Sequence, residues 1–179
     1  MMMSKQSLSM IWDHLRQMNG IAMRLVDNLP ADKLDAKPIP NMRTPKELLV
    51  HTYGAVVRGI AGGIAAGEFS ELDEKAASVA IMTKQDLVRY CTDCWKEADR
   101  VVAGVTETQL NAMVKTPWGT SMPGTFCVQV IRDELAHHRG QLYTYLRALG
   151  QDVPMMWDFE HNAPEYQPKA QPGASLIPR

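Results

Sequence analysis

The sequence predicts an all-α protein: a four-helix, up-down-type bundle with long crossover loops and a proline-rich C-terminal tail. Proline breaks helices, and the prolines leave three long stretches free, at 1–29, 46–116 and 124–153. Within these stretches apolar residues recur every three or four positions, which is typical of amphipathic helices. No stretch of comparable length alternates with a period of two. We therefore expect no substantial sheet, with short extended pieces at most near 113–116.

The middle stretch is long enough for two helices, with a break around 67–82. The expected helices are 4–29, 44–67, 83–104 and 124–149. The first ends at Pro30, and its apolar stripe consists of Leu8, Ile11, Leu15, Met18, Ala22, Leu25 and Leu29.

The second and third expected helices both begin with a capping pattern. Thr44 can cap the second helix, Pro45 suits the first helical position, and Glu47 can bond back to the cap. The third begins at Thr83 with Asp86 three residues later. Its apolar stripe includes two cysteines, Cys91 and Cys94, which we interpret as core residues because one such pair is too few ligands for a structural zinc site.

The fourth expected helix begins after Pro123 and ends near Leu149, with Gly150 in the usual position of a C-terminal cap. Its inward stripe comprises Ile131, Glu134, Leu135, His138, Leu142, Tyr145, Leu146 and Leu149. Arg139 and Gln141 fall off that stripe. His137 is turned from His138 by about 100°, so we expect it to point elsewhere.

The chain has 179 residues, the size of one domain. We assign 1–150 to a single bundle domain and 151–179 to a tail, because 5 of the 11 prolines lie there without periodicity. We expect the tail to lie on the surface, either of its own domain or of a partner subunit.

Charge and composition exclude several classes of partner. Lys and Arg total 19 against 20 Asp and Glu, without the basic excess of a nucleic-acid binder. No apolar run approaches the roughly 18 residues of a membrane span, and the first ten residues do not resemble a signal peptide. Three cysteines are an odd number, which favours a reduced protein. We therefore expect a cytoplasmic protein that binds neither nucleic acid nor membrane.

Three ionisable residues interrupt the inward stripes. Glu134 and His138 are four residues apart and share a helix face, and His51 occupies an inward position in the second helix. A lone buried carboxylate costs several kcal/mol unless it is paired or bound to a metal. Two readings remain open: a core in which Glu134 pairs with a histidine, and a metal site. Facing helices of a bundle can build such a site, with two histidines, one carboxylate and open coordination positions.

Several motifs resemble one known family. The fourth helix carries DELAHHRGQL at 133–142 and YLRALG at 145–150, followed by Val153 and Pro154, and TPKELLVH at 44–51 opens the second helix. These motifs resemble the signature of the DinB-like superfamily, whose members are four-helix metalloenzymes. The resemblance covers residues from about 5 to 155 and is most specific in the fourth helix.

The resemblance implies a ligand set. His51 matches the second-helix metal histidine and His138 the last fourth-helix ligand, whereas Glu134 stands where the family usually has histidine. A carboxylate can ligate a divalent ion, so we expect His51, Glu134 and His138 to hold zinc, nickel, manganese or iron. No catalytic residue can be assigned from the motifs.

The same resemblance implies a class of activity. Members of the wider superfamily are similar to thiol-dependent S-transferases and isomerases, and hydrolytic roles are also proposed for the family. We expect a metal-dependent transferase or hydrolase that acts on a small molecule. Two alternatives remain: a non-catalytic metal or small-molecule binding protein of a stress response, and a structural dimeric bundle without metal. The glycine-rich second helix, the tail and the family habit predict a homodimer.

Overall fold

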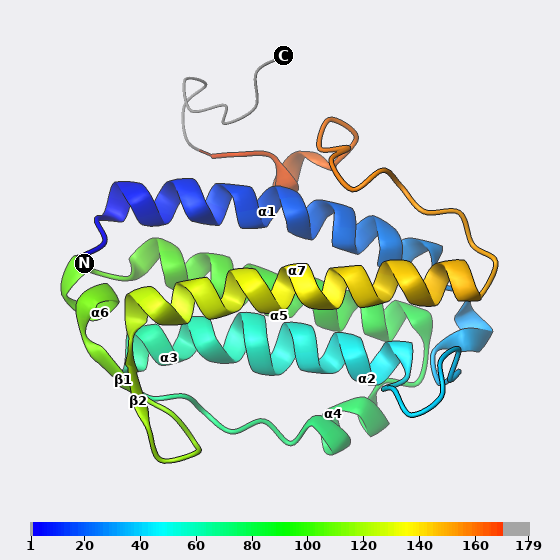
Figure 1. Ribbon diagram of the computed structural model, residues 1–179, viewed down its shortest axis with the longest axis horizontal. Helices are drawn as coiled ribbons and strands as arrows, with labels where there is room; N and C mark the ends of the chain where they lie inside the picture. The colour runs from blue at the N-terminus through cyan, green and yellow to red at the C-terminus, as the bar shows by residue number, and fades with distance from the viewer. Residues whose placement is uncertain (1, 170–179) are drawn as a thin grey trace.

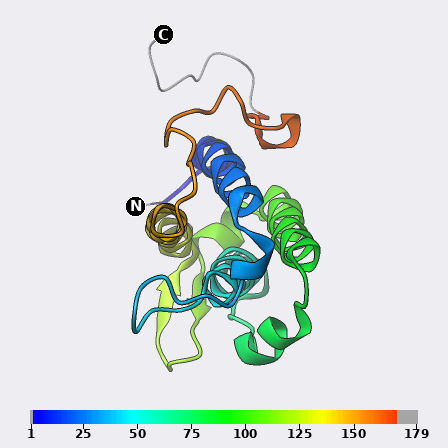
Figure 2. The ribbon, with the colours of Figure 1, turned by 90° about the vertical axis from the view of Figure 1, so that its right-hand side faces the viewer.

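Four long helical segments lie side by side in the computed structural model, which describes residues 2–169 (Figure 1). Seen end-on, they occupy the four corners of a bundle (Figure 2). The prediction of a mainly helical protein is confirmed, and each segment lies within one residue of its expected bounds. The segments are α1 (Lys5–Asn28), the continuous run of α2 (Pro45–Val50), η2 (His51–Ile60) and α3 (Ala61–Ala66), α5 (Lys84–Gly104), and α7 (Gly124–Ala148).

Short elements fill the connections between these segments. The sequence predicts neither α4 nor α6. It allows a short extended piece near 113–116, where β1 lies, whereas β2 lies outside that range. The strands pair antiparallel, with Val114 opposite Met122. The short elements are η1 (Ala31–Lys33), α4 (Glu74–Ala80), α6 (Glu107–Asn111), β1 (Met113–Lys115), β2 (Ser121–Pro123) and η3 (Pro164–Tyr166).

The helix directions do not alternate strictly. Lys84 Nζ, at the start of α5, donates to the carbonyl oxygen of Asp27, at the end of α1, so these helices are antiparallel. Lys46 Nζ, at the start of α2, lies 3.4 Å from the carbonyl oxygen of Ile81, just before α5. The α2–α3 run and α5 therefore point the same way. The connection from Gly67 to Thr83 carries the chain back along the whole bundle, as Figure 1 shows.

The predicted caps form. Thr44 and Glu47 exchange hydrogen bonds at the start of α2, and Thr83 and Asp86 do so at the start of α5. Each pair satisfies two backbone N–H groups that the first helical turn leaves without partners. The α2–α3 run ends at Gly67, whose φ of +85° favours a residue without a Cβ. Local sequence therefore fixes where the second helical segment begins and ends and where α5 begins.

The second helical segment is unusual in its middle. From His51 to Ile60 it is a π-helix, the form of helix whose hydrogen bonds reach five residues back rather than four. The run from Pro45 to Ala66 is long and apolar enough to cross a membrane, with a mean hydropathy of 1.3 over 18 residues, and 72% of that window is buried inside the structure. The sequence alone did not single out this run as a possible membrane span. Its burial inside the structure is typical of a core helix.

All four segments contribute to one continuous core. Leu15, Tyr53, Leu87 and Ile131, one from each segment, are completely buried. Cys91, Cys94 and Cys127 are buried and free. Core packing, the interpretation given to the Cys91–Cys94 pair, is therefore sufficient to account for them.

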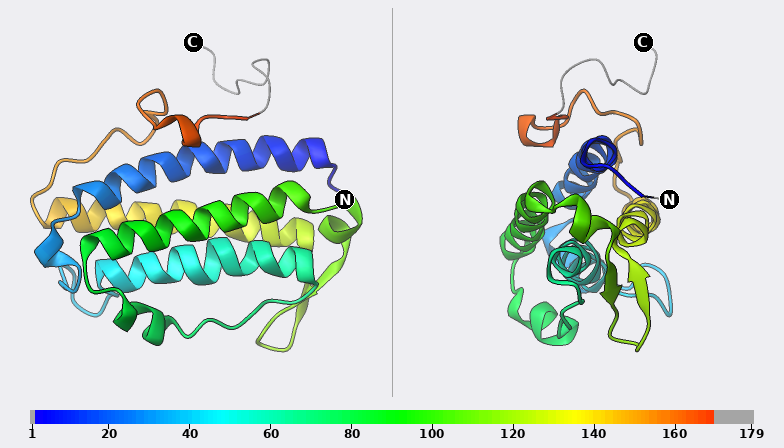
Figure 3. Two further views of the ribbon diagram at one scale, coloured as in Figure 1. Left: turned by 180° about the vertical axis from the view of Figure 1, so that it is seen from behind. Right: turned by 90° about the vertical axis from the view of Figure 1, so that its left-hand side faces the viewer.

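Residues 151–169 of the predicted tail lie against the outside of α1 (Figure 3). Arg24 in α1 contacts Asp158 through its carboxylate at 2.6 Å and its carbonyl oxygen at 2.8 Å. Phe159 and Tyr166 are buried. This part of the tail covers its own domain, and residues 170–179 lie outside the described range.

A buried ionic cluster fastens the tail. The guanidinium of Arg16 contacts the carboxylates of Asp13 and Asp99, and Trp12 Nε1 donates to Asp99 at 3.0 Å. Lys169 donates its backbone N–H to Asp13 at 3.0 Å, and its Nζ contacts Asp99. The cluster thus joins α1, α5 and the tail.

Candidate metal centre

The three candidate ligands converge between two helical segments. His51 is the first residue of η2, and Glu134 and His138 lie one turn apart on α7, which packs against η2. One ligand atom from each residue lies within 4.8 Å of the other two. The structure therefore brings together all three residues that the sequence singled out.

The ring of His138 is held by its Nδ1 and leaves its Nε2 without a hydrogen bond. Nδ1 lies 2.8 Å from Gln141 Oε1, an acceptor, so Nδ1 carries the proton. Nε2 is fully buried and makes no hydrogen bond within the described residues, although Glu134 Oε2 lies 2.9 Å away. Nε2 thus lies beside a carboxylate oxygen without the alignment of a hydrogen bond, and a cation bound by both atoms would stabilise this arrangement.

The ring of His51 is held in the same way by a different group. Its Nδ1 lies 2.6 Å from Oε1 of Glu74, the first residue of α4. Arg43 Nη2 lies 3.6 Å from the other oxygen of Glu74. The rings of His51 and His138 are perpendicular, with centroids 5.0 Å apart. With Nδ1 engaged, His51 has Nε2 left for a ligand.

Sequence reasoning missed the roles of Glu74 and Gln141. Gln141 was placed off the ligand face, yet a residue three positions after His138 lies over the next turn and can reach its ring. Glu74 falls in the connection interpreted as a break. The available signal was Asp73, whose side chain caps α4 by accepting from the Ala76 N–H.

The surroundings of His138 favour its neutral form. Burial lowers the pKa of His138, and the neighbouring His51 adds to this, against smaller opposing effects of Gln141 and Glu134. A neutral imidazole is the form that binds metal. The carboxylate of Glu134 is 41% exposed, which places the solvent side of the cluster at this ligand.

The donor set fits a divalent transition metal. Two imidazoles and one carboxylate suit zinc, iron, nickel or manganese, and three protein donors leave coordination positions open for water or substrate. The buried Nε2 of His138, which has no hydrogen-bond partner in residues 2–169, is the feature that a metal would satisfy.

Other candidates do not join this cluster. His137 is exposed, and its ring lies 5.0 Å from that of His138. Trp118 is 63% exposed on the β1–β2 connection and packs edge-on against Phe69. A second group of possible ligands, in the tail, is largely exposed, and one of its carboxylates already binds Arg24. That group consists of Asp158, Glu160 and His161.

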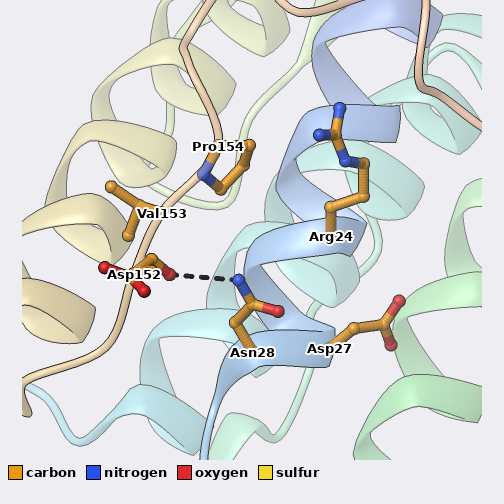
Figure 4. A pocket seen from close by; sticks show the side chains of 6 residues that line it. All are labelled: Arg24, Asp27, Asn28, Asp152, Val153 and Pro154. Carbon is orange, nitrogen blue, oxygen red and sulfur yellow. Dashed lines mark hydrogen bonds between the residues drawn. The ribbon is translucent and has the colours of Figure 1, made fainter.

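A separate hollow lies at the end of α1, with a volume of about 510 Å³ (Figure 4). Across it, Asn28 Nδ2 donates to the carbonyl oxygen of Asp152 at 3.1 Å. Its lining is Arg24, Asp27, Asn28, Asp152, Val153 and Pro154. None of the candidate ligands lines this hollow, so it is distinct from the His–Glu–His cluster.

Helical bundles that gather histidine and carboxylate side chains between two facing helices form a class of metal-binding folds, and this structure has that arrangement. The model of the DinB family matches residues 2–170, and this chain belongs to that family. The resemblance seen in the motifs is therefore confirmed. Among curated proteins, no relative matches the chain.

Solved structures share the fold. A DinB-like protein of Bacillus subtilis is 20% identical with a TM-score of 0.66, covering 82% of this chain and 96% of its own. A candidate DinB-family member from Exiguobacterium sibiricum is 25% identical with a TM-score of 0.60, covering 87% and 96%. A mutant of a mycothiol-dependent maleylpyruvate isomerase is 13% identical with a TM-score of 0.58, covering 87% and 69%.

Proposed function

We propose that this protein is a metal-dependent enzyme of the DinB family that binds one divalent cation through His51, Glu134 and His138. The observation that carries the proposal is the buried Nε2 of His138, which lies 2.9 Å from a Glu134 oxygen and makes no hydrogen bond with any residue that the structure describes. The convergence of His51 on the same point supports it.

A bound cation would act as a Lewis acid and lower the pKa of a coordinated water or thiol. The chain's own contribution is to hold two imidazoles and one carboxylate in place before the metal arrives. Because Glu134 is partly exposed, the open positions face solvent on its side of the cluster. The second helix and α7, both held in the core, fix the distance between the ligands.

A thiol-dependent S-transfer is our first choice of reaction, because one structural neighbour is a mycothiol-dependent isomerase. In that case the metal would hold a thiolate from a low-molecular-weight thiol, and the surrounding side chains would select the electrophile. A hydrolase that uses coordinated water is the second choice. Both reactions use the same three ligands.

Two further functions compete with the enzyme. A non-catalytic metal or small-molecule binding protein would share the ligands. A structural bundle would instead pair Glu134 with an imidazolium of His138, which their 2.9 Å approach favours. The buried position of His138 opposes that pairing, because burial lowers its pKa and disfavours the charged ring.

Metal analysis of protein purified without a histidine tag tests the proposal. After incubation with zinc, nickel, manganese or iron(II) and gel filtration, the wild type should retain about one ion per chain. His138→Ala should retain none, whereas His137→Ala, which removes the exposed neighbouring histidine, should bind like the wild type. A wild type that holds no metal under any of these conditions would leave the ion-paired core as the better description.

Activity assays then separate an enzyme from a binding protein. The metal-loaded wild type and His137→Ala should catalyse transfer from a low-molecular-weight thiol to an electrophile, or hydrolysis, while His138→Ala should not. Metal retention without turnover across both screens would favour the binding protein. We also propose that the protein works in the cytoplasm as a homodimer.

A further inference from the structure

We propose that Glu74 and Gln141 are positioning residues that set the tautomer of the two metal histidines, and that the carboxylate of Glu74 contributes more to metal affinity than the amide of Gln141. This inference rests on the proposed function, because it assigns these two residues to the same metal site. Neither residue belongs to the His–Glu–His cluster itself.

The contacts at Nδ1 fix the tautomer of both histidines. Each histidine has its Nδ1 against a side-chain oxygen, at 2.6 Å for His51 and 2.8 Å for His138. In a neutral imidazole only one nitrogen carries the proton, and an oxygen acceptor places that proton on the nitrogen it faces. Both rings are thereby held with the Nε2 lone pair available. The selection is built into the metal-free protein.

The two acceptors differ in charge. Glu74 offers a carboxylate, whereas Gln141 offers a neutral amide oxygen. A carboxylate on the far nitrogen raises the basicity of a metal-bound imidazole, and removing such a partner typically lowers metal affinity about 10- to 100-fold. We expect the larger effect at His51, since a charged acceptor makes the stronger hydrogen bond.

The packing of α4 against α2 and the contact with Arg43 hold Glu74 beside His51. Glu74 begins α4, within the long connection that returns the chain along the bundle, and α4 packs against α2. Arg43, one residue before the cap of α2, approaches the carboxylate oxygen of Glu74 that does not contact His51, at 3.6 Å. The connection thus supplies a carboxylate to a ligand of the second helix. This gives α4 a role that helix packing alone does not require.

The experiment compares Glu74→Gln, Glu74→Ala and Gln141→Ala with the wild type. Glu71→Gln is the matched control, because it removes one carboxylate from an exposed position in the same connection. Glu74 is 33% exposed, so its variants should fold, and thermal unfolding by circular dichroism checks this. Imidazole ¹⁵N NMR of the metal-free proteins reads the tautomers, with assignments from His51→Ala and His138→Ala spectra. Zinc affinity is measured by chelator competition.

The wild type should show both histidines protonated on Nδ1. Glu74→Ala should release the tautomer of His51 and weaken zinc binding about 10- to 100-fold. Glu74→Gln, whose amide oxygen still accepts, should keep the tautomer and lose less affinity. Gln141→Ala should change only His138, and Glu71→Gln should change nothing.

Two results separate this inference from the proposed function. If the wild type binds zinc and Glu74→Ala binds it equally well, or if His51 carries its proton on Nε2, the positioning role is wrong while the metal site stands. If the wild type binds none of zinc, nickel, manganese and iron(II), the proposed function fails, and the positioning role toward a metal fails with it.

Discussion

At the scale of single residues, the neighbours of each imidazole nitrogen determine which nitrogen can bind a metal. His138 has an amide oxygen on one nitrogen and an unbonded carboxylate on the other. The motif spacing predicted which side chains would meet, since Glu134 and His138 are one turn apart. It could not predict Glu74, because a contact between residues 23 positions apart depends on the path of the connection between them.

Replacing His138 should separate metal binding from stability. We expect His138→Ala to remove the metal yet to destabilise the metal-free protein less than Leu142→Ala, which should cost about 2–5 kcal/mol. The reason is that the histidine variant also relieves a buried, unpaired ring nitrogen. Urea unfolding of both metal-free variants measures the difference. Equal losses would argue that His138 acts mainly as a packing residue.

Replacing Glu134 by histidine should keep or strengthen metal binding. Glu134→His installs the residue that the family usually has at this position, and the partly exposed site has space for the ring. Calorimetric titration with zinc and nickel, beside Glu134→Ala, tests this expectation. Weaker binding by the histidine variant than by the alanine variant would contradict it.

Two histidines outside the site should respond oppositely to pH. Burial, aided by Arg139 and Arg132, lowers the pKa of His14, whereas Asp158 raises the pKa of His161. The unfolded protein therefore binds more protons at position 14, and stability from His14 is lost as pH falls below about 6.5. Stability from His161 is present below about 6.5 and lost as pH rises through its raised pKa.

Unfolding curves between pH 5 and 8 of metal-free protein test these signs. His14→Gln should flatten the loss of stability on acidification, and His161→Gln should steepen it. Parallel pH profiles for wild type and both variants would show that neither ring has a shifted pKa.

At the scale of elements, capping patterns predicted where two of the four long helical segments begin, because a cap is a local interaction. Thr44 with Glu47 and Thr83 with Asp86 begin their helices as expected. The order of directions was not predictable in this way. It depends on the connection from Gly67 to Thr83, whose only local signals are a short helix and its Asp73 cap.

The buried cluster that joins α1, α5 and the tail should be a large contributor to stability. Arg16→Ala removes the guanidinium between Asp13 and Asp99, and we expect a loss of about 3 kcal/mol because each of these largely buried carboxylates then loses its contact with a buried positive charge. Arg100→Ala, in the exposed part of α5, should change stability by less than about 0.5 kcal/mol. Similar values for the two variants would contradict this role.

At the scale of the whole molecule, the family and the mainly helical fold followed from composition, periodicity and motif. The metal, the substrate and the number of subunits do not follow from these features, because each depends on an interaction outside a single chain. The domain division at residue 150 likewise stays a prediction. The described part of the tail packs against α1, where Asp158 contacts Arg24 and Asn162 donates to the carbonyl oxygen of Gln17.

The protein should be a homodimer. The glycine-rich second helix motivates this prediction, together with large apolar side chains on the surface such as Trp118 and Phe126, which are 63% and 55% exposed. Light scattering coupled to gel filtration at micromolar concentration should give about twice the 20.0 kDa mass of the chain. A single species at the monomer mass would overturn it.

The direction in which His51 points depends on how many residues the π-helical segment contains, and not only on which residues they are. His51 is its first residue, and the helix that follows is anchored in the core at Ile60 and beyond. A relative that lacked one residue between 52 and 60 could close this segment into an ordinary α-helix. Its ligand would then turn by about 100° about the helix axis, away from α7. Among homologues, an indel in this short window should therefore mark the loss of metal binding even where all three ligand residues remain.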